Sequence, residues 1–262
     1  MRVLYFKLRE FFFLGGLSML MMGCGLHQSI TDKDDHRKAI FSFVFDDLNA
    51  TDTTVKNIFD EYNFKPSFAL VSKKLNAETA KLYKSYYEEG ISILSHSITH
   101  PKMRDSTLDV AMINREFQYS KETIEKYGIE VTGFVTPNSY LHPQYLKLAE
   151  EYYEYSFTNN NDNKFDKSVP KHSLARYGIE ANISSVDHNI ETIVSRIDSA
   201  IAEKELLVFY GHQMPSTYKD DEGNSRVNTE DLRNILDYLK AKSDNNECKV
   251  LSADAAVAEY YN

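Results

Sequence analysis

Residues 40–47 read IFSFVFDD, an apolar run that ends in two adjacent carboxylates. A short apolar run bounded by polar residues is typical of a strand buried in a sheet. Three further runs end in the same way: ISIL at 91–94 leads into SHSITH, GFVT at 133–136 into PNS, and LLVFYG at 206–211 into His212. Because the carboxyl ends of parallel strands converge on one face of a barrel, the polar residues after these four runs are candidates for one site.

Helical patterns separate most of the predicted strands. Alternating strands and helices predict an α/β fold, with a mainly parallel sheet and helices outside it. Seven or eight such units in about 220 residues favour a closed or nearly closed barrel over an open sheet. The strands are expected at 40–45, 66–71, 91–95, 132–136, 155–158, 174–179, 206–211 and 249–252, and the helices at 52–62, 77–89, 107–127, 142–151, 190–203 and 229–242.

The composition sets the class of protein. With 262 residues, 42% hydrophobic and 26% charged, the chain can bury a full core, which excludes a disordered protein. The formal net charge of −9 would repel nucleic acid phosphates, so a nucleic acid partner is not expected. The chain has no Trp, which constrains any family whose motifs require one.

The amino terminus has the pattern of an export signal. Arg2, Lys7 and Arg9 precede an apolar run over residues 11–22, which is too short to span a bilayer comfortably, and Cys24 follows. The residues before this cysteine resemble a bacterial lipoprotein box. The resemblance implies a signal peptide at 1–23, a lipidated Cys24 and a cell-envelope location on a membrane. The alternatives are a plain signal peptide cleaved elsewhere and an uncleaved anchor.

The mature chain would have three features. Without residues 1–23 it keeps 27 basic and 38 acidic residues, a net charge of −11. Residues 24–38 are polar and form a short tether, and residues 39–262 form one domain because no linker or repeat interrupts them. A lipidated Cys24 would leave Cys248 without an intrachain disulfide partner.

His96 and His100 form an H-x-x-x-H pair in SHSITHP. Pro101 disfavours a helical backbone at His100, so the pair is expected on a strand exit or a tight loop. Two imidazoles and one carboxylate, supplied by Asp46 or Asp47, suit a catalytic metal site with open positions for water.

The motifs, taken in order, resemble those of the polysaccharide deacetylases of the NodB-homology type, carbohydrate esterase family 4. FVFDD is similar to the first motif, which implies that Asp46 is the catalytic base and Asp47 a metal ligand. HSITH is similar to the second motif, whose histidines, here His96 and His100, are the other two ligands. LLVFYGH resembles the last motif, whose histidine, here His212, is the general acid.

The third and fourth motifs depart from the family's common pattern. FVTPNSY resembles a branch written F-A-Y-P-Y-G, which implies an oxyanion-binding backbone N–H near Asn138, after Pro137. In that branch an arginine follows later, and HSLARYGIE offers Arg176 to keep the catalytic base ionised. The fourth motif usually ends in Asp-Trp, and FTNNND leaves Asn159 or Asp162 as stand-ins.

The resemblance implies a distorted (β/α)7–8 barrel of the NodB deacetylase type and a metal-dependent hydrolase acting on carbon–nitrogen bonds of linear amides. The substrate would be an acetylated polysaccharide or oligosaccharide of the cell envelope or the diet, with N-acetyl, or alternatively O-acetyl, groups removed. The cofactor would be a divalent metal, with zinc expected and cobalt or nickel as alternatives. The rival interpretation is a metal-holding, carbohydrate-binding lipoprotein with little catalysis, suggested by the altered third and fourth motifs.

Overall fold

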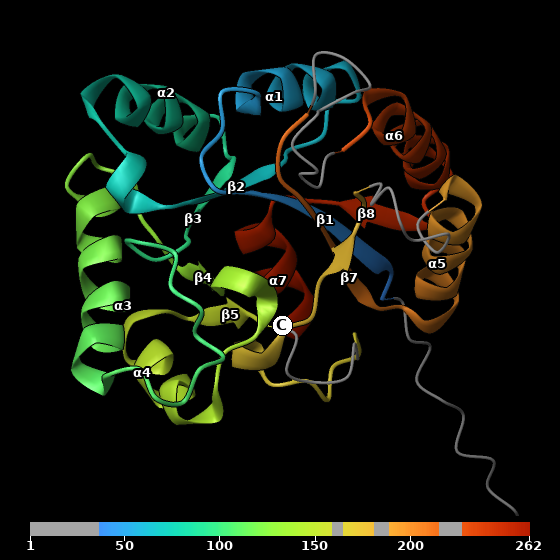
Figure 1. Ribbon diagram of the computed structural model, residues 1–262. Coiled ribbons are helices and arrows are strands. Elements are labelled where there is room, and N and C mark those ends of the chain that lie inside the picture. The colour runs from blue at the N-terminus through green and yellow to red at the C-terminus, as the bar shows by residue number, and fades with distance from the viewer. Residues whose placement is uncertain (1–36, 159–164, 181–188, 215–226) are drawn as a thin grey trace, which may run out of the picture. The chain divides into compact units, whose positions relative to one another are not determined.

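The computed structural model describes residues 37–158, 165–180, 189–214 and 227–262, and strands and helices alternate through them as predicted (Figure 1). The predicted signal peptide, Cys24 and most of the tether lie outside these residues. The strands are β1 (Ala39–Asp46), β2 (Ser67–Leu70), β3 (Ser92–Ser95), β4 (Gly133–Val135), β5 (Tyr155–Phe157), β6 (Tyr177–Gly178), β7 (Leu206–Gly211) and β8 (Cys248–Val250). The helices are α1 (Asp52–Glu61), α2 (Ala77–Glu88), α3 (Val110–Glu125), α4 (Pro143–Tyr152), α5 (Ile190–Glu203), α6 (Thr229–Asp244) and α7 (Ala253–Tyr261).

The described strands form one parallel sheet in the order β5-β4-β3-β2-β1-β7-β6, and β8 pairs with the first residues of β1. A single segment brings the two ends of this sheet together. Leu174 pairs with Phe157 of β5, and three residues later Tyr177 pairs with Phe209 of β7. The sheet therefore curls into a distorted barrel with helices outside, which confirms the predicted fold class (Figure 1).

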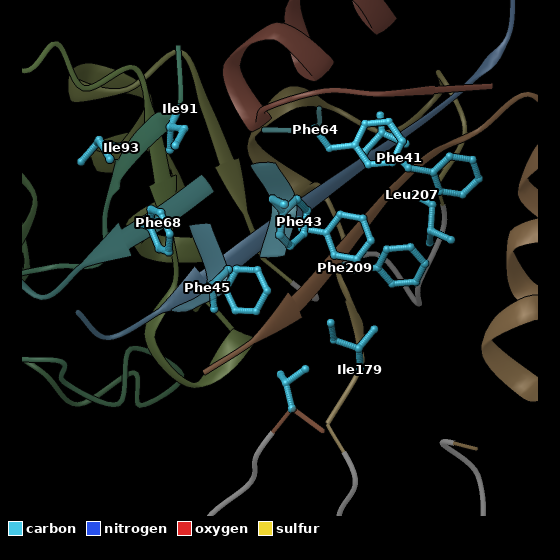
Figure 2. Close-up of a cluster of buried hydrophobic side chains, with 14 of the residues drawn as sticks. Phe41, Phe43, Phe45, Phe64, Phe68, Ile91, Ile93, Ile179, Leu207 and Phe209 are labelled. Carbon is cyan, nitrogen blue, oxygen red and sulfur yellow. The ribbon is translucent and has the colours of Figure 1, made fainter. Parts of the chain in front are cut away.

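Alternation along β1 divides the core into two layers. Phe41, Phe43 and Phe45 project from one side of the strand, beside Phe209 of β7 (Figure 2). The ring centroids of Phe43 and Phe209 lie 4.9 Å apart, and those of Phe43 and Phe59 of α1 lie 5.1 Å apart. These contacts bury the outer face of the barrel against its helices. Each Å² of apolar surface removed from water stabilises the fold by roughly 25 cal/mol.

The other face of β1 lines the interior. Ile40 and Val44 pack in a separate cluster with Leu94 and Val208, from the inner faces of β3 and β7. Because side chains alternate along a strand, Asp46 continues the inward series of β1. His96 and His212 continue the inward series of β3 and β7 in the same way, so the polar residues at these strand ends point toward the barrel axis.

Helix α7 closes the amino-terminal end of the barrel (Figure 1). The N–H groups of Ala253 and Asp254 donate to the side-chain oxygens of Ser67 and Ser92, the first residues of β2 and β3, at 2.8 and 2.9 Å. This helix is not predicted from the sequence. Its buried residues, Ala253, Ala256, Val257 and Tyr260, recur at helical spacing, but two of these four are alanines, which makes the apolar stripe weak.

Most predicted boundaries differ from the structure by one or two residues, and two differ by more. Helix α3 begins at Val110, not near 107, because the Asp109 carboxylate accepts from the N–H of Ala111 at 2.7 Å and caps the helix. The predicted strand at 174–179 shortens to a bridge at Leu174 and the two residues of β6. Cys248 is a buried free thiol, and no described helix is long and apolar enough to cross a membrane.

Candidate active site

Three predicted metal ligands lie together at the carboxyl end of the barrel. Asp47 follows β1, whereas His96 and His100 lie in the loop that leaves β3. The Asp47 Oδ1 atom lies 3.5 Å from the Nε2 atom of each histidine, and one ligand atom from each residue lies within 4.8 Å of the others. Two imidazoles and one carboxylate at this separation can hold a divalent cation.

The surroundings of His96 show whether the cluster of Asp47, His96 and His100 suits a metal ion. Its ring is 1% exposed, and Nδ1 lies 2.8 Å from the carbonyl oxygen of Val135. Because a carbonyl can only accept, Nδ1 carries the hydrogen and Nε2 presents a lone pair, which is buried and has no hydrogen-bond partner. Burial lowers the pKa of His96 to about 4 despite the opposing charges of Asp46 and Asp47, so the ring is neutral near pH 7. A neutral imidazole with an unpartnered lone pair beside a carboxylate fits a metal ligand.

Asp46 and Arg176 form a buried pair in which the predicted base meets the predicted arginine. Asp46 is 2% exposed, and its two carboxylate oxygens accept from the Arg176 Nη1 and Nη2 atoms at 2.8 and 2.9 Å. Burial by itself would raise the pKa of Asp46, but the Arg176 guanidinium, with smaller effects from His96 and His212, holds it below its ordinary value. The carboxylate is therefore ionised at neutral pH.

His212, the predicted acid, is oriented by Glu180. The Glu180 Oε1 atom lies 2.9 Å from the His212 Nδ1 atom and accepts from the His212 backbone N–H at 2.6 Å. Burial alone would lower the pKa of His212, but the hydrogen bond to Glu180 and the charges of Asp46, Glu180 and Asp47 raise it to about 9. His212 therefore carries a proton at neutral pH.

Glu180 is absent from the sequence prediction. The sequence feature that points to Glu180 is its spacing from Arg176. The two residues are four apart in the extended segment RYGIE, so they share one face of β6 and its continuation. Asn159 and Asp162, the expected stand-ins for the fourth motif, lie outside the described residues.

The backbone around the site is conformationally strained. Six described residues other than glycine have positive φ at the ends of β1, β3 and β4. Such conformations cost free energy for residues with a Cβ and tend to cluster at functional sites. They are Asp47 (85°), Leu48 (61°), Ser97 (65°), His100 (61°), Asn138 (57°) and Ser139 (64°).

Glu116 of α3 holds the loop between the two histidines. The Glu116 side chain is buried, and its Oε2 atom accepts from the N–H groups of Ile98 and Thr99 at 2.7 and 2.9 Å. Its Oε1 atom accepts from the Thr99 hydroxyl at 2.6 Å. The sequence prediction omits this residue, although a glutamate on the buried face of a helix, next to Phe117, is itself a signal.

The two histidines of the cluster, the pair of Asp46 with Arg176 and the pair of His212 with Glu180 line one cleft of about 480 Å³. Asn138, expected near the oxyanion site, lies on its wall, directly after the buried Pro137. The cleft thus combines a cluster suited to a cation, an ionised carboxylate, a protonated imidazole and a strained turn, which together suit hydrolysis of an acyl group. Its wall includes Asp46, His96, His100, Asn138, Arg176 and His212.

Residues 33–156 match the family model described as Polysaccharide deacetylase. The matched segment is that of a polysaccharide deacetylase domain. This finding confirms the family expected from the motifs. The match spans Asp46, Asp47, His96 and His100, whereas Arg176, Glu180 and His212 lie beyond it.

A curated relative has a similar segment. A bifunctional xylanase/deacetylase from Pseudobutyrivibrio xylanivorans is 25% identical over 100 residues, which are 37% of this chain and 16% of that protein. The polysaccharide deacetylase domain thus corresponds to a small part of that longer relative.

Solved structures share the fold at low sequence identity. The Xyl-CE4 domain of a multidomain xylanase from the hindgut metagenome of Trinervitermes trinervoides has a TM-score of 0.54 at 16% identity, over 85% of this chain and 91% of that one. A family 4 acetyl xylan esterase from Clostridium thermocellum, in complex with cobalt, has a TM-score of 0.51 at 16% identity, over 84% of this chain and 90% of that one. A CE4 family pseudoenzyme from Bacillus anthracis has a TM-score of 0.55 at 16% identity, over 86% of this chain and 66% of that one.

Proposed function

We propose that this protein is a hydrolase that depends on a divalent metal and removes N-acetyl groups, or alternatively O-acetyl groups, from an acetylated glycan. One observation supports the proposal most strongly. One cleft is lined by His96 and His100, by an ionised Asp46 paired with Arg176, and by a protonated His212. Asp47 lies 3.5 Å from both histidines of that cleft and completes the cluster.

Each residue of the candidate active site has a chemical role in this proposal. A divalent cation held by Asp47, His96 and His100 would lower the pKa of a bound water and polarise the acetyl carbonyl, with zinc the expected ion and cobalt or nickel as alternatives. Asp46 accepts a proton from the attacking water, and Arg176 keeps that carboxylate ionised before attack.

Asn138 and His212 carry the remaining steps of the proposed reaction. As the water oxygen bonds to the acetyl carbon, a backbone N–H at Asn138 donates to the developing oxyanion. His212 then gives its proton to the sugar amine, or to the sugar hydroxyl of an ester, when the bond to the acetyl carbon breaks. Glu180 stays hydrogen-bonded to Nδ1, which leaves Nε2 of His212 to donate.

Acetate release from two substrates tests the proposal. N-acetylated chitin oligomers and O-acetylated xylan, assayed side by side with zinc, cobalt or nickel, should separate amide from ester hydrolysis. We expect multiple turnovers on one of them. Binding of the oligomer without acetate release would favour the rival function, a metal-holding, carbohydrate-binding lipoprotein, for which the fold-level similarity to a CE4 pseudoenzyme is a reason.

Export and lipidation are a separate proposal. The positive residues before the apolar run at 11–22, followed by Cys24, support a signal peptide over 1–23 and a lipid anchor on Cys24 in the bacterial cell envelope. The domain at 39–262 would then face its glycan while attached to a membrane through the tether at 24–38.

Substitution of Glu180 by Gln should change the pH dependence of the reaction. A general acid works while it is protonated, so wild-type kcat/KM should fall as the pH rises through about 9, the pKa of His212. Removing the Glu180 charge lowers that pKa, so the alkaline limb should move down by about one unit or more. A pH profile of kcat/KM between pH 5 and 10 measures the shift.

Glu61→Gln, in the exposed pair with Arg233, is the matched control and should keep the wild-type profile. An alkaline limb that stays in place in Glu180→Gln would remove His212 from the role of acid.

A further inference from the structure

Two basic side chains lie on the wall of the catalytic cleft without a part in the proposed reaction. Lys102 and Arg104 line it together with Asp46 and His212. Both are exposed, whereas Met103 between them is fully buried. The loop after His100 therefore turns one apolar residue into the core and both of its charged neighbours toward the open side.

The loop that presents them is held by α4. The Met103 carbonyl oxygen accepts from the His142 backbone N–H at 2.9 Å, and the Tyr145 hydroxyl donates to the Asp105 carbonyl oxygen at 3.0 Å. The Asp105 carboxylate accepts from the Thr107 N–H at 2.8 Å. The backbone is thus bonded on both sides of Arg104, so the loop from which the two cations project is held at the wall of the cleft.

The other charges of the cleft have partners of their own. Asp46 pairs with Arg176 at 2.8 Å, Glu180 pairs with His212 at 2.9 Å, and Asp47 lies in the metal cluster. Among the described residues, no carboxylate lies within 4.0 Å of the Lys102 or Arg104 nitrogens. The chain carries a net charge of −9, so a pair of cations at the cleft is a local feature and not an effect of composition.

We propose that Lys102 and Arg104 form an anion-binding subsite that selects acetylated glycans with a carboxylate, as in a uronic acid, on the sugar next to the acetylated one. The planar guanidinium of Arg104 matches a carboxylate through two hydrogen bonds, and the Lys102 ammonium adds a second positive charge. The inference rests on the proposed function for the reaction at this cleft, but the subsite itself is a binding property and can be measured without turnover.

Calorimetric binding of two tetrasaccharides tests the subsite. A hyaluronan tetramer alternates glucuronate with N-acetylglucosamine, whereas a chitin tetramer contains N-acetylglucosamine alone and is neutral. The wild-type protein should bind the acidic tetramer about tenfold more tightly at low ionic strength, and added salt should reduce this preference. The Lys102→Gln/Arg104→Gln variant should bind the two with equal affinity.

The matched control removes the same charge elsewhere. Lys81 on α2 and Arg115 on α3 are exposed and do not line the cleft, so Lys81→Gln/Arg115→Gln should keep the wild-type preference. Equal affinities in the wild-type protein, no measurable binding of the acidic tetramer, or a preference that survives in Lys102→Gln/Arg104→Gln would each overturn the proposal. A preserved preference with no acetate released from any glycan would refute the proposed reaction and leave the anion-binding subsite standing.

Discussion

Asp46→Asn should lower kcat/KM for acetate release by about 10²–10⁴-fold, the usual range for loss of a general base. The amide keeps the shape of the carboxylate but accepts no proton from water. The bidentate contact with Arg176 also loses one acceptor, because the amide nitrogen would face a guanidinium N–H. A loss of about 1–3 kcal/mol in the free energy of unfolding should accompany the change.

Steady-state acetate release, measured well below the melting temperature of the variant, separates the two effects. Asp109→Asn is the matched control, because asparagine caps a helix as well as aspartate does and Asp109 only caps α3. This control should keep wild-type kcat/KM. An Asp46→Asn variant with more than about a tenth of wild-type activity would contradict its assignment as the base.

His96→Ala should remove the bound metal. The substitution deletes the buried lone pair that faces Asp47, leaving one imidazole and one carboxylate. Loss of a residue that only orients a ligand already costs about 10–100-fold in metal affinity, so loss of a ligand should cost more than about 100-fold. Elemental analysis after dialysis against a metal-free buffer measures the result, with the melting temperature as a check on folding.

A second variant guards against misfolding, since His96 is buried. His100, whose side chain is 33% exposed, supplies the other imidazole, so His100→Ala should lose the metal without a large cavity. The control is His142→Asn, which removes a histidine but keeps an acceptor at the amino terminus of α4. Wild-type metal content in both alanine variants would refute the ligand assignment.

The parts of the site that follow from the sequence are those encoded in short segments. The alternation of FSFVF places its phenylalanines against the helices and, by the same period, directs Asp46 inward. The proline of SITHP predicts the loop that brings His96 and His100 together. Convergence of parallel strand ends then predicts that these residues meet.

The parts that the sequence leaves open depend on tertiary closure. Glu180 reaches His212, 32 residues later, only because the two-residue strand β6 pairs with β7. Glu116 meets Ile98 and Thr99 only after α3 has packed beside the loop. A local pattern can mark Glu180 and Glu116 as unusual, but their partners depend on how the barrel closes and are not given by a local period.

Although the third and fourth motifs are altered, the proposed base and the proposed acid each have a charged partner. Arg176 and Glu180, from one short segment, contact Asp46 and His212 respectively. A positive partner for the base and a negative partner for the acid give the two groups opposite protonation states near neutral pH. This separation is the electrostatic arrangement that acid–base catalysis needs, and it favours an enzyme over a binding protein.

The most direct measurement of the central claim is acetate release by the purified protein before chelation, after chelation and after the metal is restored. The proposed function predicts release from an acetylated glycan that falls to background once the metal is removed and returns with zinc, cobalt or nickel. Release that is unaffected by complete removal of the metal, or no release from any acetylated glycan by the metal-loaded protein, would contradict it.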